Sequence, residues 1–224
     1  MRLVSSAENS TLDWRSAYSY IEDIGDDRGY TAGLIGFCSG TGDMLEIVVA
    51  YKREDRDNPL VRFLPALRRV NGTASHEGLG RPFVRAWKRA ADDPVFRRLQ
   101  RQERDRAYFN PAVRRAKGDG LSTLGQFIYY DAMVMHGPGT DAESFGGIRA
   151  VARDLADTPS DGGSEVAYLH AFLDVRRGVM KAEAAHEDTS RIDDAQRRFL
   201  DERNWGLRPP LVWHVYGDRY EISR

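Results

Sequence analysis

Residues 120–139, GLSTLGQFIYYDAMVMHGPG, form the richest apolar stretch of the chain and decide its fold class. The pattern predicts a helix that is hydrophobic on nearly every side and that ends at Gly-Pro-Gly. A helix of this kind is buried, so we expect it to be the central helix on which other elements pack. Asp131 interrupts the stretch, and a buried carboxylate without partners is costly.

The segments on both sides of this helix predict a mostly helical protein with one small sheet, of the α+β class. RGYTAGLIGFCSG, residues 28–40, has the glycines and the β-branched and aromatic residues of a short hairpin. Thr41 is predicted to cap a following helix, and residues 69–83 are predicted to be a loop. Further helices are expected at 2–20 (broken near Ser10), 94–109, 147–156, 164–184 and 191–203, with an extended segment at 210–222.

Length and composition exclude several classes of protein. A chain of 224 residues with 41% hydrophobic residues fits one globular domain, or one domain split into two lobes. No apolar run approaches the roughly 20 residues of a membrane helix. The single cysteine, Cys38, excludes an internal disulfide and is expected to be buried. The five histidines show no metal-ligand spacing, so we predict no metal site and no cofactor. The N-terminus lacks a signal region, which predicts a mature, trimmed or cytosolic form.

Charge is unevenly distributed along the chain. Residues 1–50 hold eight acidic and three basic residues (net −5), whereas residues 51–119 hold 18 basic and nine acidic residues (net +9). The segment IEDIGDDRGYT, residues 21–31, is the most crowded, with Glu22, Asp23, Asp26 and Asp27 close together. Such a cluster is either a solvated turn or a surface that faces a positively charged partner.

Two carboxylates from different elements can break a glycosidic bond. One protonates the leaving oxygen, while the other attacks the sugar or activates water. Glu8, late in the first helix, and Asp26, in a loop before the hairpin, have this arrangement in the sequence. The alternative is that Glu8 only caps or solvates its helix.

Several long motifs carry a resemblance to a known family. LVSSAENSTLDW, YIEDIGDDRGYTAGLIGFCSGTGDML, LGQFIYYDAMVMHGPG, SFGGIR and EAAHEDTSR occur in this order. They resemble the glycoside hydrolase family forty-six chitosanases of soil bacteria, from Leu3 to the C-terminus. The resemblance implies a secreted, extracellular, endo-acting enzyme that hydrolyses β-1,4 bonds between glucosamine units with inversion. It also implies a lysozyme-like fold with a cleft between two lobes, here expected at 1–40 with 120–224 (major) and 41–119 (minor).

The same resemblance implies roles for individual residues. Glu8 matches the general acid, Asp26 the general base, Thr31 a residue that holds the attacking water, and Asp43 a carboxylate that binds a substrate amine. Positions that line the cleft in relatives match Ser10, Tyr20, Arg28, Thr41, His186 and Asp218.

Asp131 matches a carboxylate that the family ties to two arginines, here Arg176 and Arg191, with Glu183 close by. This network is either purely structural or a means of tuning Glu8. The four tryptophans, at positions 14, 87, 205 and 213, either pack in the core or stack on sugars.

One departure from the family pattern is Asp27, where relatives commonly have glycine. Asp27 adds a like charge beside Asp26 and is a second candidate for the base. The position of Asp26 in the motif favours Asp26.

The expected partners are chitosan and glucosamine oligosaccharides, bound by a monomer with no affinity for nucleic acid or membranes. Two other functions remain open. The basic segment 51–119 would suit a nucleic-acid or anionic-surface binding module, although helix 94–109 interleaves charges of both signs as a solvated face does. A lysozyme or endochitinase would use the same acid pair on acetylated sugars.

Overall fold

The computed structural model describes residues 1–182 and 188–224, which form two compact units. Unit 1 consists of Met1–Leu12 and Arg106–Arg224, and unit 2 consists of Asp13–Asp105. Each unit contains its own cluster of buried hydrophobic side chains. Among the described residues, no helix is both long enough and apolar enough to cross a membrane.

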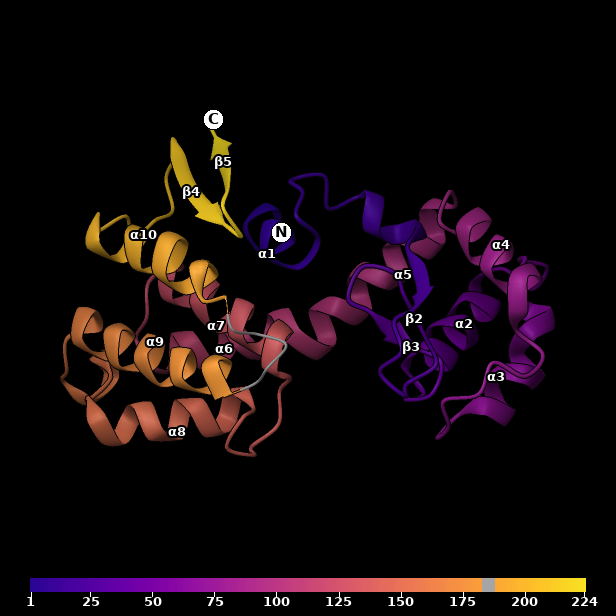
Figure 1. The fold of residues 1–224 in the computed structure, drawn as a ribbon, viewed down its shortest axis with the longest axis horizontal. Coiled ribbons are helices and arrows are strands. Elements are labelled where there is room, and N and C mark those ends of the chain that lie inside the picture. The colour runs from indigo at the N-terminus through magenta and orange to yellow at the C-terminus, as the bar shows by residue number, and fades with distance from the viewer. Residues whose placement is uncertain (183–187) are drawn as a thin grey trace. The chain divides into compact units, whose positions relative to one another are not determined.

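Unit 1 is built around α7 (Thr123–His136), as residues 120–139 predict. Ser122 caps this helix through its Oγ, and eight of its residues, Asp131 among them, are buried. Its neighbours are α6 and α8, and α8 also packs against α9 (Figure 1). The other elements of unit 1 are α1 (Arg2–Asn9), a π-helical turn (Asp105–Phe109, which starts at the last residue of unit 2), α6 (Asn110–Gly118), α8 (Phe145–Leu155), a 3₁₀ turn (Pro159–Asp161), α9 (Glu165–Ala182), a second π-helical turn (Arg191–Gln196), α10 (Arg197–Asp201), β4 (Leu211–Val215) and β5 (Asp218–Ile222).

Unit 2 holds a small antiparallel sheet and the helices that cover it. The strands are β1 (Ile21–Asp23), β2 (Tyr30–Ala32) and β3 (Phe37–Cys38), hydrogen-bonded in that order. Ala32 and Phe37 from the sheet join the buried cluster of the helices. Around the sheet lie a 3₁₀ turn (Ser16–Ser19), α2 (Asp43–Glu54), a second 3₁₀ turn (Val61–Phe63), α3 (Leu64–Val70), α4 (Gly80–Ala90) and α5 (Pro94–Arg104) (Figure 1).

Three local features differ from the sequence-based expectations. The first helix ends at Asn9, and only a 3₁₀ turn at Ser16–Ser19 follows within the predicted range. Gly42, not Thr41, is the N-cap of α2. The predicted loop 69–83 is shorter, because α3 extends to Val70 and α4 begins at Gly80.

The unit boundaries also differ from the expected lobes 1–40 with 120–224 and 41–119. Residues 13–40 belong to unit 2 because Ile21, Ala32 and Phe37 are buried in its core. Residues 106–119 belong to unit 1 because α6 packs against α7, with Ala112 and Ala116 fully buried.

Candidate active site

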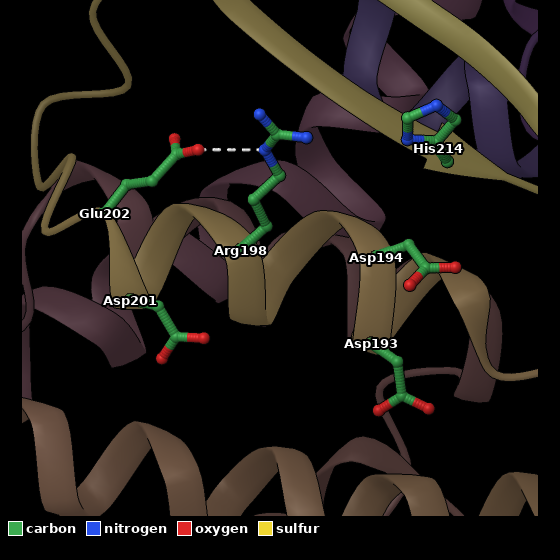
Figure 2. Close-up of a pocket in the computed structure, with 6 residues that line it drawn as sticks. All are labelled: Asp193, Asp194, Arg198, Asp201, Glu202 and His214. Atoms are coloured by element: carbon green, nitrogen blue, oxygen red, sulfur yellow. Dashed lines mark hydrogen bonds and ion pairs between the residues drawn. The ribbon is translucent and has the colours of Figure 1, made fainter.

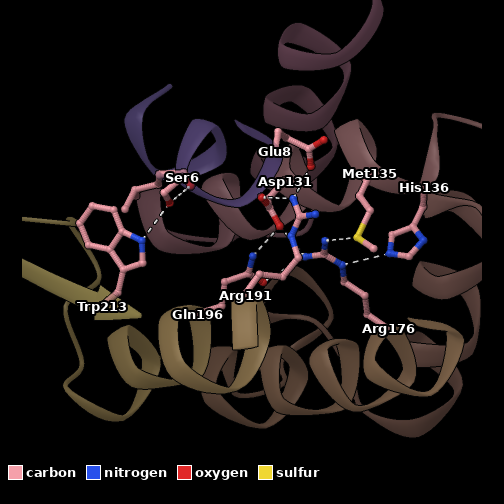
Figure 3. A network of polar contacts seen from close by, with 10 residues as sticks. Ser6, Glu8, Asp131, Met135, His136, Arg176, Arg191, Gln196 and Trp213 are labelled. Carbon is pink, nitrogen blue, oxygen red and sulfur yellow. Dashed lines mark hydrogen bonds and ion pairs between the residues drawn. The ribbon is translucent and has the colours of Figure 1, made fainter. Parts of the chain in front are cut away.

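Glu8 lies in the last turn of α1, a helix anchored to the C-terminal hairpin. Val4 and Ala7 bury one face of α1 in the core of unit 1. Ser6 Oγ donates to the Leu3 carbonyl (2.7 Å) and accepts a hydrogen bond from Trp213 Nε1 of β4 (2.9 Å) (Figure 3). This side-chain link fixes the helix turn that carries Glu8, whose own side chain is 34% exposed.

Glu8 is joined to the central helix by one arginine nitrogen. Arg191 Nη2 donates to Glu8 Oε1 (2.6 Å) and to Asp131 Oδ1 (2.8 Å) (Figure 3). Arg191 comes from the π-helical turn after α9, and Asp131 comes from α7. Residues 8, 131 and 191 are therefore brought together from three distant parts of the sequence.

The second carboxylate oxygen of Asp131 is also hydrogen-bonded. This atom, Oδ2, accepts hydrogen bonds from Arg176 Nη1 (2.8 Å) and Gln196 Nε2 (2.7 Å). Arg176 also donates from Nε to His136 Nε2 (3.2 Å). Asp131 is 1% exposed, and burial alone would raise its pKa, but the charges of Arg191 and Arg176 and their hydrogen bonds hold that pKa well below its usual range.

The charges of Arg191, Asp131 and Arg176 together set the electrostatic environment of Glu8. An arginine in contact with a carboxylate favours the ionised form, whereas a general acid has to carry a proton. Because Asp131 stays ionised between Arg191 and Arg176, it offsets part of their positive charge. The pairing of Asp131 with both arginines is present in the structure, and Glu183 lies outside the described residues.

Asp26 lies in the loop between β1 and β2 and forms a two-pronged contact with a neighbour. Arg28 donates to Asp26 Oδ2 from Nε (2.8 Å) and from Nη2, and the Arg28 backbone N–H donates to Asp26 Oδ1 (3.1 Å). The Asp26 side chain is 25% exposed. Partial burial acts to raise its pKa, but Arg28 outweighs burial and lowers the pKa. Asp26 is therefore held ionised and oriented, as a base must be.

Asp27 adopts a backbone conformation that favours glycine. Its φ is 61°, in the left-handed region, which aspartate tolerates better than most residues. Its side chain is exposed, whereas Asp26 is partly covered and bound by Arg28. The glycine common at this position in the family pattern thus has a conformational reason, and Asp27 preserves the loop shape.

Thr31 lies in the middle of the small sheet. It pairs with Glu22 of β1 and with Cys38 of β3. Its side chain is 8% exposed, and its Oγ1 lies 3.5 Å from Cys38 Sγ. Cys38 is buried, as expected, and donates to the Gly36 carbonyl (3.2 Å). Burial raises the pKa of this thiol, which keeps it protonated.

Asp43 is the first residue of α2, and its two carboxylate oxygens differ in their surroundings. Oδ1 accepts hydrogen bonds from Thr41 Oγ1 (2.7 Å), Cys38 N (2.9 Å) and Met44 N (2.9 Å). Oδ2 makes no hydrogen bond with the described residues. Burial raises the pKa of Asp43 despite these donors. The hydrogen bonds to Oδ1 thus orient the carboxylate, and Oδ2 is left able to accept a hydrogen bond from a ligand.

The remaining expected cleft residues are distributed over both units. Tyr20 is exposed in unit 2 and donates to Glu22 Oε2 (3.3 Å). Ser10 ends α1 in a left-handed conformation, and Asp218 is the exposed first residue of β5, both in unit 1. His186 lies outside the described residues. Of the tryptophans, Trp87 and Trp213 are buried in the two cores, which excludes them as exposed sugar platforms.

A separate pocket of about 430 Å³ lies beside α10 in unit 1 (Figure 2). Most of its charges are already paired: Glu202 with Arg198 (2.9 Å), and Asp193 with Arg177 (2.7 Å). None of the expected catalytic residues lines it. Its lining residues are Asp193, Asp194, Arg198, Asp201, Glu202 and His214. Across residues 1–182 and 188–224, no group of three or more His, Cys, Asp and Glu side chains could hold a metal ion.

Two residues that support the site were not identified from the sequence. Gln196 completes the bonding of Asp131, and Ser6 holds α1 to Trp213. Both are small or neutral polar residues with no motif of their own.

Comparisons with known proteins place the whole chain in one family. The model of glycosyl hydrolase family 46 matches residues 2–211. A chitosanase from Streptomyces sp. strain N174 is 61% identical over 223 residues, which cover 100% of this chain and 80% of that protein. A chitosanase from Bacillus subtilis strain 168 is 35% identical over 98% of this chain and 81% of its own length. Among solved structures, a Gynuella sunshinyii chitosanase in complex with chitotetraose matches with a TM-score of 0.89 and 34% identity, covering 100% of this chain and 95% of that one.

Proposed function

Because the chain belongs to glycosyl hydrolase family 46, we propose that it hydrolyses β-1,4 bonds between glucosamine units within chitosan chains, with inversion of the anomeric carbon. The chitosanases that it resembles at 61% and 35% identity support the substrate class. The polymer is too large to enter a cell intact, so we also propose that the enzyme acts outside the cell. We further propose that it acts as a monomer and without a cofactor.

The observation that carries the mechanism is the bonding of Asp26. Arg28 contacts one carboxylate oxygen through its guanidinium and the other through its backbone N–H. This contact lowers the pKa of Asp26 and fixes its orientation. A base that removes a proton from water has to be ionised and aimed, and Asp26 meets both conditions. Thr31, on the strand that follows, is the residue proposed to hold the water.

Glu8 is proposed to protonate the leaving oxygen. It is bound on one oxygen by Arg191, whose charge Asp131 partly offsets. In this role Glu8 transfers a proton to the glycosidic oxygen as the bond breaks. Inversion requires the two carboxyl groups about 6.5–9.5 Å apart in the reacting complex, so that a water fits between the base and the sugar.

The acidic residues of unit 2 are proposed to recognise the charge of the substrate. Chitosan carries ammonium groups when its amines are protonated, and a cluster of carboxylates concentrates such a polycation. Glu22, Asp23 and Asp27 are exposed around the loop of Asp26. Asp43 Oδ2 is proposed to bind one ammonium directly. These features explain why the crowded segment 21–31 is tolerated.

The experiment that tests this function compares substrates. Chitosans with graded degrees of acetylation, chitin and bacterial cell walls would be digested under the same conditions, and the new reducing ends counted. We expect the rate to fall steadily as acetylation rises, with little release from chitin or cell walls. Faster hydrolysis of acetylated polymer would instead identify a lysozyme or endochitinase.

A further inference from the structure

Segment 71–79 is connected to the loop that carries Asp26 through the backbone of Gly40. Gly40 N donates to the Arg28 carbonyl (2.9 Å), and Gly72 N donates to the Gly40 carbonyl (2.7 Å). A side chain at Gly40 would lie 2.4 Å from the Thr73 carbonyl, so only glycine permits this close approach. One end of segment 71–79 is thereby connected to the residue that binds Asp26.

His76 contacts the same loop where it leaves the sheet. Asp23 and Tyr30 are the last register pair of β1 and β2, and residues 24–29 form the loop between them. The His76 ring packs on Tyr30 with 4.3 Å between ring centroids, and its Nε2 lies 3.6 Å from Asp23 Oδ2. Asp23 Oδ1 in turn accepts a hydrogen bond from Gly25 N, inside the loop (3.0 Å). His76 thus touches both stems of the loop.

The His76–Asp23 contact depends on a proton. His76 Nε2 is buried and makes no hydrogen bond with the described residues, so Asp23 is its polar neighbour on that side. An imidazole gains its charge between about pH 8 and pH 5, and the charged form attracts a carboxylate. The other groups near His76 are Tyr30, which packs on its face, and Glu77, which is paired with Arg69 (3.4 Å).

We propose that His76 is a positioning residue for Asp26: its protonated ring holds Asp23 and Tyr30 together and so fixes the loop that aims the base. This inference rests on the proposed role of Asp26. The clamp requires the charged imidazole, as the binding of chitosan by carboxylates requires its charged amines.

The test compares His76→Phe with the wild type on the same chitosan at several pH values. Phenylalanine keeps the ring contact with Tyr30 but cannot be protonated. We expect the turnover number (kcat) of the variant to be about two- to fivefold below wild type at pH 5, the range of a partly exposed ion pair, and to converge with it by pH 8. Both enzymes act on the same substrate at each pH, so the effect of substrate protonation cancels in the ratio of their kcat values. A ratio that is constant across this range, or equal to one throughout, would overturn the proposal.

A second variant and a second measurement separate this proposal from the assignment of the base. Asp23→Asn should show the same pH-dependent loss, and the double variant should lose no more than either single variant. Hydrogen exchange of the Gly25 amide, followed by NMR at pH 5, should be faster in His76→Phe. Unchanged exchange would exclude the clamp itself. Faster exchange with unchanged turnover would show that the clamp exists but that the loop does not hold the base.

Discussion

Asp26 and Asp43 are two carboxylates of the same unit whose surroundings act on them in opposite directions. Arg28 lowers the pKa of Asp26 and binds both of its oxygens. Burial raises the pKa of Asp43, which the protein holds by one oxygen only. The first arrangement suits a base that stays ionised, and the second suits a residue that gains a cationic ligand.

The first prediction concerns the acid and the base. Glu8→Gln and Asp26→Asn should each lower kcat by about 10²–10⁴-fold, because each removes one of the two proposed proton-transfer groups. The measurement is initial-rate kinetics on fully deacetylated chitosan, with circular dichroism to verify the fold.

Asp27→Asn is the matched control for Asp26→Asn. It removes the neighbouring charge and keeps a residue that tolerates the φ of 61°. We expect its rate to stay close to wild type. A loss as large as that of Asp26→Asn would mean that the base is Asp27 or is shared, and near-normal turnover of Glu8→Gln would exclude Glu8 as the acid.

The second prediction concerns substrate charge. Asp43→Asn keeps an oxygen to accept from Cys38 N and Met44 N, so the start of α2 should be preserved. The variant would lose the proposed charge-assisted hydrogen bond to an ammonium, worth about 1.5–3 kcal/mol, so kcat/KM on deacetylated oligomers should fall about 10- to 100-fold.

Selectivity distinguishes recognition from helix capping at Asp43. If Asp43 binds the ammonium, discrimination against acetylated units should relax in Asp43→Asn while the melting temperature changes little. If the variant keeps the wild-type preference for deacetylated substrate, Asp43 only caps α2.

At the scale of elements, α7 links the stability of unit 1 to its chemistry. The helix is buried along most of its length, and its aspartate, Asp131, is paired with two buried arginines and offsets part of their charge. Asp131→Asn leaves that positive charge without its partner. Removing one member of a buried pair costs about 3–5 kcal/mol, so the free energy of unfolding should fall by this order at neutral pH.

The pH dependence of this loss follows from the lowered pKa of Asp131. In the unfolded chain an aspartate binds its proton near pH 3.9, whereas folded Asp131 stays ionised below that pH. Its contribution to stability is therefore complete above about pH 5 and declines as the pH falls below the unfolded value. Urea unfolding at pH 7 and pH 3 should show a smaller gap between wild type and Asp131→Asn at the lower pH.

Asp174→Asn provides the comparison for Asp131→Asn. Asp174 is also paired with an arginine, Arg197, but its side chain is 68% exposed. We expect a loss of less than about 1 kcal/mol at either pH. Equal losses in the two variants would contradict the role given to the buried network.

Sequence patterns predicted those helices and strands whose pattern lies within one short segment of the chain. α7 was predicted because residues 124–133 are apolar on nearly every side over a length that favours a buried helix over a strand. α3 and α4 were not predicted, because both are short and basic and each carries a proline, Pro65 or Pro82, in its first turn. Residues 13–40 were expected with residues 120–224, but they cluster with residues 44–99, and no local pattern records such a long-range contact.

In the candidate site, too, contacts within one motif were predicted more readily than contacts between distant positions. Asp26, Arg28 and Asp43 occur in continuous motifs, and the hydrogen bonds from Arg28 to Asp26 and from Thr41 to Asp43 each span two residues. The partners of Glu8 and of Asp23 are 183 and 53 positions away, at Arg191 and His76. Arg191 was found through a family resemblance, whereas His76 and Gln196 were not found at all.

At the scale of the whole molecule, the charge distribution predicts how salt affects the enzyme. The acidic residues around Asp26 attract a polycation over a distance that shrinks from about 30 Å at 0.01 M salt to about 3 Å at 1 M. We expect KM for chitosan to rise over this range while kcat changes little. Initial rates at several ionic strengths provide the measurement.

Neutralising the exposed cluster gives the control for the effect of salt on the polymer itself. The double variant Glu22→Gln/Asp27→Asn changes two exposed carboxylates and leaves Asp26 and Asp43 in place. Its KM should be higher at low salt and should respond less to added salt. An unchanged salt dependence would mean that these carboxylates do not steer the substrate.

The assignment of Glu8 and Asp26 as acid and base is tested most directly by the anomeric form of the first product. Proton NMR of fully deacetylated chitosan during the first minutes of hydrolysis resolves the two anomers before they interconvert. If Asp26 activates a water on the face opposite to the leaving group, the new reducing end appears first as the α-anomer. Initial release of the β-anomer would show retention, and Asp26 would then have to act as a nucleophile rather than as a base.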